Sequence, residues 1–509
     1  MDSKCVQFFQ NKTILVTGVP GFLAKVFLEK ILRVQPDVKR LYLLLRSTDN
    51  ESAMERFRTE VLEKDLFRVL RNDLGDANLK IVLKKVVPIP GDISVVNLGL
   101  KDSDLLQHMW NEIEIIVNVA ATTNFDERYD VGLSINTFGP LNVLNFAKKC
   151  VKGQLLLHVS TAYVCGEKPG ILPEKTFKMG ETLNSNGKLV IETEMELMKQ
   201  KLKELQKQEC SEEEIAQSMK DLGMSRATLH GWPNTYVFTK SMGEMLLGNH
   251  RENLPLVIIR PTMITSTFSE PFPGWIEGLR TIDSVIVAYG KGRLKCFLAD
   301  SNSVLDLIPV DMVANAMVMA VAIHAGKSGS QDVYHVGSSC KNPITFGQLH
   351  DLAARYFTKS PLVGRDGSPI IVSKGTILST MSQFSFYMTL RYKLPLQICS
   401  LCSAPNRLRS SLRDGIVGSA LINYHFSNQG FSSAARKVAF GGVEPVSQPP
   451  WRSEQTGTST AFALPAHPGA LGLGYWSINC ALALEKESMR MRWWHRFFLF
   501  SVFYLKSPS

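Results

Sequence analysis

The stretch YVFTK, residues 236–240, places a phenol and an amine four residues apart. On a helix, residues with this spacing share one face, so Tyr236 and Lys240 would lie one turn apart. A free tyrosine has a pKa of about 10, too high for ready proton exchange near neutral pH. A cation one turn away would lower the pKa of Tyr236 and make it a candidate general acid. The same spacing arises by chance on many amphipathic helices, so the pair alone decides nothing.

Two hydroxyl side chains follow the apolar run LLLHV, residues 155–159. At the end of a buried strand, the hydroxyl of Ser160 or Thr161 would face a ligand cleft. There it could donate a hydrogen bond to a carbonyl oxygen as negative charge develops. Local capping of the backbone is the ordinary alternative for such residues.

A glycine turn lies near the start of the chain, in ILVTGVPGFLAK, residues 14–25. An apolar run leads into Gly18 and Gly21, and a helix-like stretch begins at Phe22. The order strand, glycine turn, helix suits a loop that wraps a phosphate. The third small position is Ala24 rather than glycine, and Pro20 removes one backbone N–H from the turn. A glycine pattern of this kind is weak evidence by itself.

Arg46 comes directly after the second strand-like run, LYLLL at residues 41–45. Dinucleotide folds that prefer NAD place an acidic side chain here for the ribose 2′-hydroxyl, whereas an arginine suits a 2′-phosphate. No acid ends this run, so the sequence favours NADP(H). A solvated surface arginine is the alternative.

The elements that would position these residues alternate between strand and helix. Strand-like runs lie at 13–17, 41–45, 85–93, 113–120 and 155–160, with helical stretches that include 22–32 and 141–150. The pattern resumes at 254–261, 308–325 and 333–338. Such alternation predicts an α/β fold, a Rossmann-like doubly wound parallel sheet with helices on both faces. Ligands bind such sheets at the carboxyl ends of the strands.

Two segments depart from this rhythm. Residues 170–228 are rich in Lys and Glu and predict a solvated helical insertion, with a substrate lid as the alternative. Residues 345–396 look helical, and the text after about Gln397 is dense in Ser, Gly, Ala and Pro without periodicity. We therefore expect a reductase domain at 1–344, a partial helical domain at 345–396 and an atypical, disordered tail at 397–509.

Composition excludes several classes of function. The net charge of +10 is concentrated at the end of the chain, and no basic stripe is interleaved with aromatic residues, so nucleic-acid binding is not predicted. There is no run of eighteen apolar residues, and residues 1–13 lack the features of a cleaved leader. The nine cysteines form no framework and suit a reducing compartment. No metal site is predicted.

The order glycine turn, Arg, NVAAT, Ser/Thr, YxxxK, RP is the arrangement of extended short-chain dehydrogenases/reductases. Longer stretches resemble plant fatty acyl-CoA reductases: IVNVAATTNFDE (116–127), HVSTAYVCGEKPG (158–170), HGWPNTYVFTKSMGEM (230–245) and IIRPTMITSTFSEPFPGW (258–275). The resemblance runs from about residue 8 to 396. It implies an enzyme that uses two NADPH to reduce a long-chain acyl-CoA, through an aldehyde, to a primary alcohol. Such alcohols feed wax, suberin or pollen-wall lipids.

The resemblance also implies roles for particular residues. The pyrophosphate would be held by the loop that contains Gly18, Gly21 and Ala24, with the amides of Phe22 and Leu23 facing it. Thr17 would also bind the cofactor. The rest of the cofactor would be met by Arg46 at the 2′-phosphate, Asp92 and Ile93 near the adenine, and Ala120, Tyr236 and Lys240. Tyr236 would donate a proton to the carbonyl oxygen, Lys240 would tune it, and Thr161 or Ser160 would polarise the substrate. The spacing to Gly166 favours Thr161.

Two departures from the family pattern leave alternatives open. The family usually has Thr where this chain has Pro20, and the text after residue 396 does not resemble the family's C-terminal domain. The alternatives are a non-catalytic isoform that binds NADPH and acyl chains, and another extended reductase or epimerase acting on a sugar nucleotide or a flavonoid. By resemblance, we expect the protein at the cytosolic face of the endoplasmic reticulum, or in the cytoplasm, with association to the membrane surface. No oligomeric state is predicted.

Overall fold

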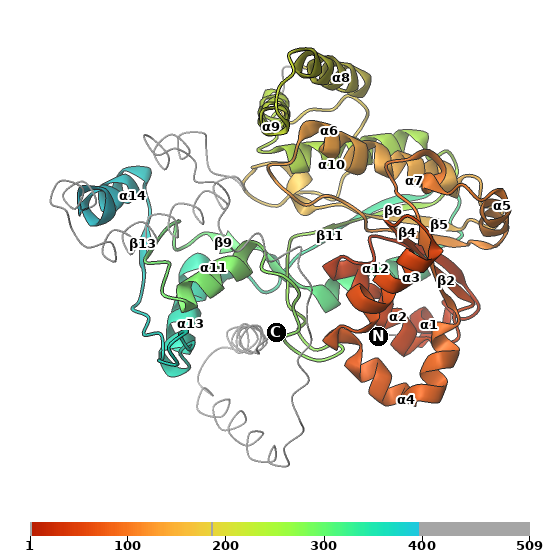
Figure 1. Ribbon diagram of the computed structural model, residues 1–509, viewed down its shortest axis with the longest axis horizontal. Helices are drawn as coiled ribbons and strands as arrows, with labels where there is room; N and C mark the ends of the chain where they lie inside the picture. The colour runs from red at the N-terminus through yellow and green to blue at the C-terminus, as the bar shows by residue number, and fades with distance from the viewer. Residues whose placement is uncertain (1–2, 185–186, 396–509) are drawn as a thin grey trace. The chain divides into compact units, whose positions relative to one another are not determined.

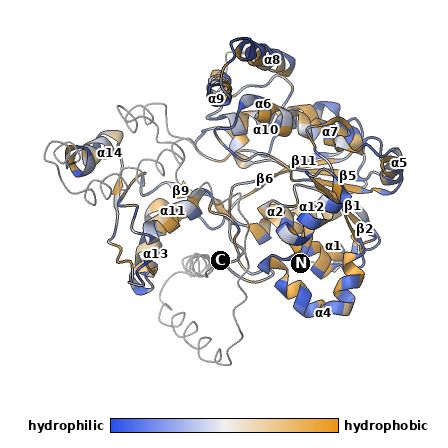
Figure 2. Ribbon diagram, viewed as in Figure 1, coloured by the Kyte–Doolittle hydropathy of each residue, from blue (hydrophilic) through white to orange (hydrophobic). Residues whose placement is uncertain are grey.

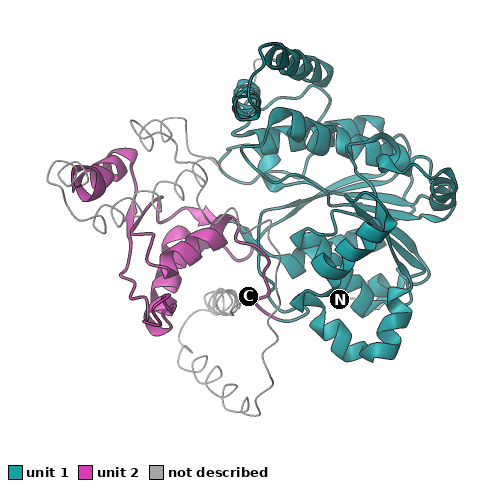
Figure 3. Ribbon diagram, in the orientation of Figure 1, with its two compact units in different colours: residues 1–272, 306–338, 428–430 teal, residues 273–305, 339–427, 431–509 magenta. Residues whose placement is uncertain are grey.

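The computed structural model describes residues 3–184 and 187–395, which form two compact units (Figure 3). Within the described chain, unit 1 comprises the residues up to 272 together with 306–338. Unit 2 comprises 273–305 and the residues from 339 onward. The expected boundary after residue 344 lies close to the division at 338, but the segment 273–305 groups with unit 2. The expectation of a disordered tail at 397–509 lies outside the described residues.

Unit 1 is built on a seven-stranded sheet in the order β11-β6-β5-β4-β1-β2-β3, and every neighbouring pair is parallel (Figure 1). The strands are β1 (Thr13–Thr17), β2 (Arg40–Leu45), β3 (Val86–Pro90), β4 (Ile115–Asn118), β5 (Leu155–Val159), β6 (Leu256–Pro261) and β11 (Gln331–Val336). The predicted doubly wound parallel sheet is confirmed. Its strand order reverses between β1 and β4, which is where such sheets bind ligands.

Helices cover both faces of this sheet (Figure 1). One layer contains α2 (Phe22–Val34) and α12 (Val310–His324), with α1 (Ser3–Gln7), α3 (Asn50–Phe57) and α4 (Arg68–Leu83) beside them. The other layer contains α5 (Ser103–Glu112), α7 (Gly139–Ala147) and α10 (Thr235–His250). Because both faces are covered, β1, β4, β5 and β6 are buried at every position. Figure 2 shows the hydrophobic character of these strands.

The predicted helical insertion is present as α8 (Ile191–Lys207) and α9 (Glu212–Leu229), which pack on each other. Ser211 begins α9 with a capping box: its hydroxyl accepts from the N–H of Glu214, and the Glu214 carboxylate accepts from the Ser211 N–H. The helices fill the second part of the segment that was expected to be helical. They pack against α6 (Tyr129–Gly132) of unit 1.

Unit 2 combines short strands with helices α11 (Thr281–Gly290), α13 (Phe346–Lys359) and α14 (Met381–Met388). Strand β8 (Cys296–Leu298) pairs with β13 (Thr376–Leu378), and β9 (Val304–Leu305) pairs with β12 (Ile344–Thr345). These pairings join 273–305 to the later residues, which explains why that segment belongs to unit 2. The segment 345–396, which looked helical from its sequence, contains α13 and α14, but β13 lies between them. In the described parts of both units, no helix combines the length and the apolar composition that a membrane crossing requires.

Candidate active site

The glycine turn lies at the point where the strand order reverses. β1 ends at Thr17, and Gly18 follows in the left-handed region with φ of 75°. A Cβ atom on Gly18 would lie 2.7 Å from the backbone N of Ala120, which follows β4. Only glycine therefore meets both the backbone conformation and the close approach.

The start of α2 carries backbone amides of the kind that bind a phosphate. Gly21 precedes the helix as its N-cap and provides no side-chain hydrogen bond to the first turn. Its N–H donates to the carbonyl of Gly18 at 2.9 Å, which fixes the turn. The amides of Phe22 and Leu23 begin the helix, where backbone N–H groups and the helix dipole favour an anion. These features fit the pyrophosphate of a dinucleotide.

The other residues predicted near the cofactor follow the neighbouring strands. Arg46 comes directly after β2 and its side chain is exposed. Asp92 and Ile93 follow β3, where the Asp92 carboxylate accepts hydrogen bonds from the N–H and the hydroxyl of Ser94, both at 2.8 Å. Ile93 packs in the core, and its carbonyl accepts from Asn142 at 2.9 Å. Because the sheet is parallel, all of these residues lie at its carboxyl edge.

Tyr236 and Lys240 both lie on α10, as the spacing predicted. Asn234 caps the helix, since its carboxamide oxygen accepts from the N–H of Val237 at 3.0 Å. The ring of Phe125 meets the ring of Tyr236 edge to face, with 5.6 Å between centroids. Burial raises the pKa of Tyr236 above its usual value, so the expectation of a lowered phenol pKa is wrong for this structure. The Lys240 amine does not offset this effect of burial, because its hydrogen bonds are made elsewhere.

Lys240 is buried, and its amine is directed at β5 instead of the phenol. Nζ donates to the carbonyl of Val159 at 2.7 Å and lies 3.2 Å from Nε2 of His158. Burial lowers the pKa of Lys240 to about 8. Burial, together with the neighbouring amine of Lys240, also holds the pKa of His158 well below its usual value.

The polar contacts of Lys240 continue across the sheet. His158 Nδ1 lies 3.0 Å from the amide nitrogen of Asn118, and the Thr17 hydroxyl donates to Asn118 Oδ1 at 2.7 Å. All four side chains are almost fully buried. The parallel register pairs Thr17 with Asn118 and Asn118 with His158, which places three side chains at one level. We call Thr17, Asn118, His158 and Lys240 the polar chain.

Asn118 and His158 are absent from the residues predicted for the site. A signal was available in the sequence, because each is a polar residue near the end of an apolar strand, in IIVN and LLLHV. A buried polar side chain at such a position requires a partner. What the sequence could not supply was the strand register that makes them partners of each other.

Ser160 and Thr161 follow β5 and are both buried. The Thr161 hydroxyl accepts from the N–H of Tyr163 at 3.3 Å and so caps the 3-10 helix η5 (Ala162–Cys165). The Ser160 hydroxyl has no hydrogen-bond partner among the described residues. Both the substrate and the capping interpretations therefore have a residue that suits them.

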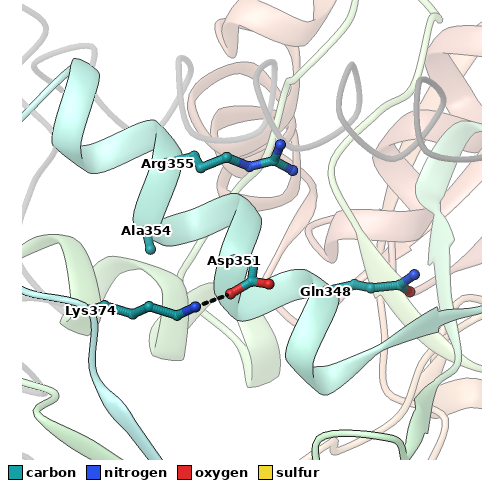
Figure 4. Close-up of a pocket in the computed structure, with 5 residues that line it drawn as sticks. All are labelled: Gln348, Asp351, Ala354, Arg355 and Lys374. Carbon is teal, nitrogen blue, oxygen red and sulfur yellow. Dashed lines mark ion pairs between the residues drawn. The ribbon is translucent and has the colours of Figure 1, made fainter. Parts of the chain in front are cut away.

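Unit 2 carries a hollow of about 410 Å³ on its own surface, lined by Gln348, Asp351, Ala354, Arg355 and Lys374 (Figure 4). Lys374 reaches toward Asp351 and pairs with it at 2.8 Å. None of the predicted site residues lines this hollow. Across residues 3–184 and 187–395, the structure contains no group of three or more His, Cys, Asp or Glu residues that could hold a metal ion.

Comparison with known proteins decides the family. The family model described as "Male sterility protein", an NAD-binding family, matches residues 16–317, a range that includes every predicted site residue. Probable fatty acyl-CoA reductase 4 of Arabidopsis thaliana is 86% identical over 402 residues, covering 79% of this chain and 82% of that protein. The chain belongs to the fatty acyl-CoA reductase family. That family lies in the extended short-chain dehydrogenase/reductase superfamily, as the sequence motifs indicated.

Two further relatives extend the comparison. Fatty acyl-CoA reductase 1 of Arabidopsis thaliana is 74% identical over 402 residues, covering 79% of this chain and 82% of that protein. Alcohol-forming fatty acyl-CoA reductase of Simmondsia chinensis is 51% identical over 399 residues, covering 78% of this chain and 81% of that protein. The family match also supports a nicotinamide dinucleotide as the cofactor of unit 1.

Proposed function

We propose that this protein reduces long-chain fatty acyl-CoA to a primary alcohol with two NADPH, through an aldehyde. The observation that carries the proposal is the placement of Tyr236 and Lys240 on α10, in a chain whose glycine turn lies between β1 and β4. The names of its relatives support the substrate class, and that of the Simmondsia chinensis protein supports the alcohol product.

The residues of the site would divide the work as follows. Bound NADPH supplies the hydride. Tyr236 keeps its proton at neutral pH because burial raises its pKa, so it is available as a general acid to the carbonyl oxygen. The Ser160 hydroxyl, which lacks a partner among the described residues, and that of Thr161 are the candidates for polarising the carbonyl.

We propose NADPH, not NADH, as the cofactor because of Arg46. Its exposed side chain follows β2, which is the strand that neighbours β1, and no acidic residue ends that strand. Arg46→Ala should raise the KM for NADPH about tenfold, the usual effect of losing one hydrogen-bonded charge pair, and leave the KM for NADH unchanged. Equal changes for both cofactors would show that Arg46 does not read the 2′-phosphate.

Expression in yeast tests the activity itself. Gas chromatography of total lipids should show new long-chain primary alcohols, and these should be lost with Tyr236→Phe. Tyr334→Phe is the matched control, because Tyr334 lies on β11 and its hydroxyl contacts His324 instead of the site. Alcohol that persists in Tyr236→Phe rejects the role of Tyr236. A wild-type chain that binds NADPH yet forms no alcohol is the non-catalytic isoform.

We also propose that the protein works at the cytosolic face of the endoplasmic reticulum, in contact with the membrane surface, and supplies alcohols for wax, suberin or pollen-wall lipids. The support is the family resemblance and the low water solubility of the product. Fractionation of plant cells that express a tagged chain should recover it with endoplasmic-reticulum markers. Recovery with the soluble fraction alone would reject this location.

A further inference from the structure

The hydrogen bonds of Thr17 determine which group donates and which accepts along the polar chain. The Thr17 hydroxyl oxygen accepts two backbone hydrogen bonds, from Val119 N–H at 3.2 Å and from Ala120 N–H at 3.1 Å. A hydroxyl has two lone pairs and one proton, so its acceptor capacity is filled and its proton must be donated. The acceptor is Asn118 Oδ1 at 2.7 Å. The oxygen of the Asn118 carboxamide therefore faces Thr17.

This orientation fixes the tautomer of His158. With its oxygen toward Thr17, Asn118 presents its NH₂ group to His158 Nδ1, 3.0 Å away. Nδ1 must accept this hydrogen bond, and a neutral imidazole whose Nδ1 accepts carries its proton on Nε2. His158 is fully buried, and burial holds its pKa well below the usual value, so the ring is neutral.

The Nε2–H group of His158 then faces the amine of Lys240 at 3.2 Å. An ammonium group has three donors and no lone pair, so it would meet another donor there. An uncharged amine can accept from Nε2–H and still donate to the Val159 carbonyl, which lies 2.7 Å from Nζ. The chain of contacts thus favours the form of Lys240 that has released a proton.

We infer that His158 is a positioning residue for Lys240: its Nε2–H fits the amine form, opposes the ammonium form, and so couples the proton on Lys240 to the glycine turn through Asn118 and Thr17. Lys240 is then a group that gains and loses a proton near neutral pH, one turn from the general acid. The link to turnover rests on the proposed function. The link between His158 and Lys240 does not.

Other charged groups near Lys240 also affect whether its amine is protonated. Glu244, one turn further along α10, favours the ammonium form, while burial is the larger effect and lowers the pKa of Lys240 to about 8. Glu244 is itself paired with the buried Arg260 of β6, with Nη2 and Oε2 2.5 Å apart. From β5, the titratable group that faces the amine is His158.

Nuclear magnetic resonance of the full chain with ¹⁵N-labelled histidine tests the tautomer without any turnover. The signal of His158 is identified among the ten histidines by its loss in His158→Gln or, if that variant does not fold, by its change in Lys240→Met. We expect the Nε2–H tautomer at about pH 9. As the pH is varied, the His158 signal should shift with a midpoint at the pKa of Lys240, about 8. An Nδ1–H tautomer at about pH 9, or a signal that does not change, overturns the inference.

The pH profile of kcat provides the second arm. In His158→Gln the side-chain carbonyl can turn toward Lys240 and accept from the ammonium form, so the inflection should move up by about one pH unit. His324→Gln is the matched control, because His324 lies on α12, in the other helix layer, and should leave the inflection in place. An unmoved inflection in folded His158→Gln shows that His158 only packs. If wild type has no acyl-CoA reductase activity, the proposed function fails and the tautomer result still stands.

Discussion

Two buried polar clusters of unit 1 show how differently the same kinds of groups can be used. In the first, the Glu194 carboxylate of α8 accepts from Tyr129 at 2.7 Å, from Arg226 Nε at 2.9 Å and lies 3.1 Å from His230 Nε2. Burial opposes its charge, but these hydrogen bonds hold the pKa of Glu194 below its usual value. In the second, the polar chain, the direct contacts of the Lys240 amine are the Val159 carbonyl and the His158 ring, while the nearby Glu244 carboxylate is paired with Arg260.

The two clusters differ in whether the buried charged group is in direct contact with a group of opposite charge. Glu194 has one in Arg226, so its charge and the geometry around it are fixed, and the cluster fastens α8 and α9 to α6. Lys240 contacts an imidazole and a carbonyl, neither of which carries a negative charge. Its ammonium form is therefore poorly stabilised, and the amine releases its proton readily. The first arrangement suits a structural role and the second suits a site that moves protons.

Removing the fixed charge should have the largest effect on stability. Glu194→Ala leaves Arg226 and His230 without their partner, and we expect the free energy of unfolding to fall by about 3 kcal/mol in urea titrations. Glu192→Ala is the control, because Glu192 lies on the same helix turn but is exposed, and it should change stability by less than about 0.5 kcal/mol. Similar losses in the two variants would refute a locking role for Glu194.

The loosely held proton should appear in the pH dependence of stability. The pKa of Lys240 is about 8 in the folded chain, against an ordinary value of 10.5, so the unfolded chain binds more protons between these values. Wild type should therefore gain stability relative to Lys240→Met by about 1 kcal/mol per pH unit as the pH rises above 8. Below pH 8 the difference between the two should be constant, because the lysine is then charged in both states. A constant difference up to pH 10 would count against the lowered pKa.

The anchor of the polar chain offers the smallest effect and a control on the same strand. Thr17 and Thr13 lie at the two ends of β1 and both are buried, but the Thr13 hydroxyl has no hydrogen-bond partner among the described residues. Thr17→Val removes the acceptor of two backbone N–H groups and should cost about 1 kcal/mol in the free energy of unfolding. Thr13→Val should be neutral or stabilising. If the two substitutions behave alike, the Thr17 hydroxyl does not anchor the chain.

Much of the fold could be predicted because its signals are local. The apolar runs end in glycine or polar residues, which marks the ends of the strands. The alternation of strands and helices is compatible with few topologies other than a doubly wound sheet. The Tyr236–Lys240 pair needed only helical periodicity. The interruption of 345–396 by β13 could not be read, because that strand is stabilised by β8, about 80 residues earlier in the chain.

The pKa values of Tyr236 and Lys240 could not be predicted from the sequence, for a related reason. Spacing alone suggested that Lys240 lowers the pKa of Tyr236, since a lysine one turn away is usually a cation. Whether it acts so depends on burial and on what β5 presents to Nζ, and both follow from strand register. The roles of Ser160 and Thr161 stay predictions: Thr161 caps η5, and the Ser160 hydroxyl has no hydrogen-bond partner in the described part of the chain.

The stoichiometry of the purified enzyme shows whether reduction goes on to the alcohol. Acyl-CoA is supplied with excess NADPH, NADPH oxidation is followed by absorbance, and released CoA is titrated as free thiol. Reduction to an alcohol at the Tyr236–Lys240 site predicts two NADPH oxidised for each thiol released, with primary alcohol as the product. One NADPH per thiol, with aldehyde as the product, would show that the enzyme does not form the alcohol.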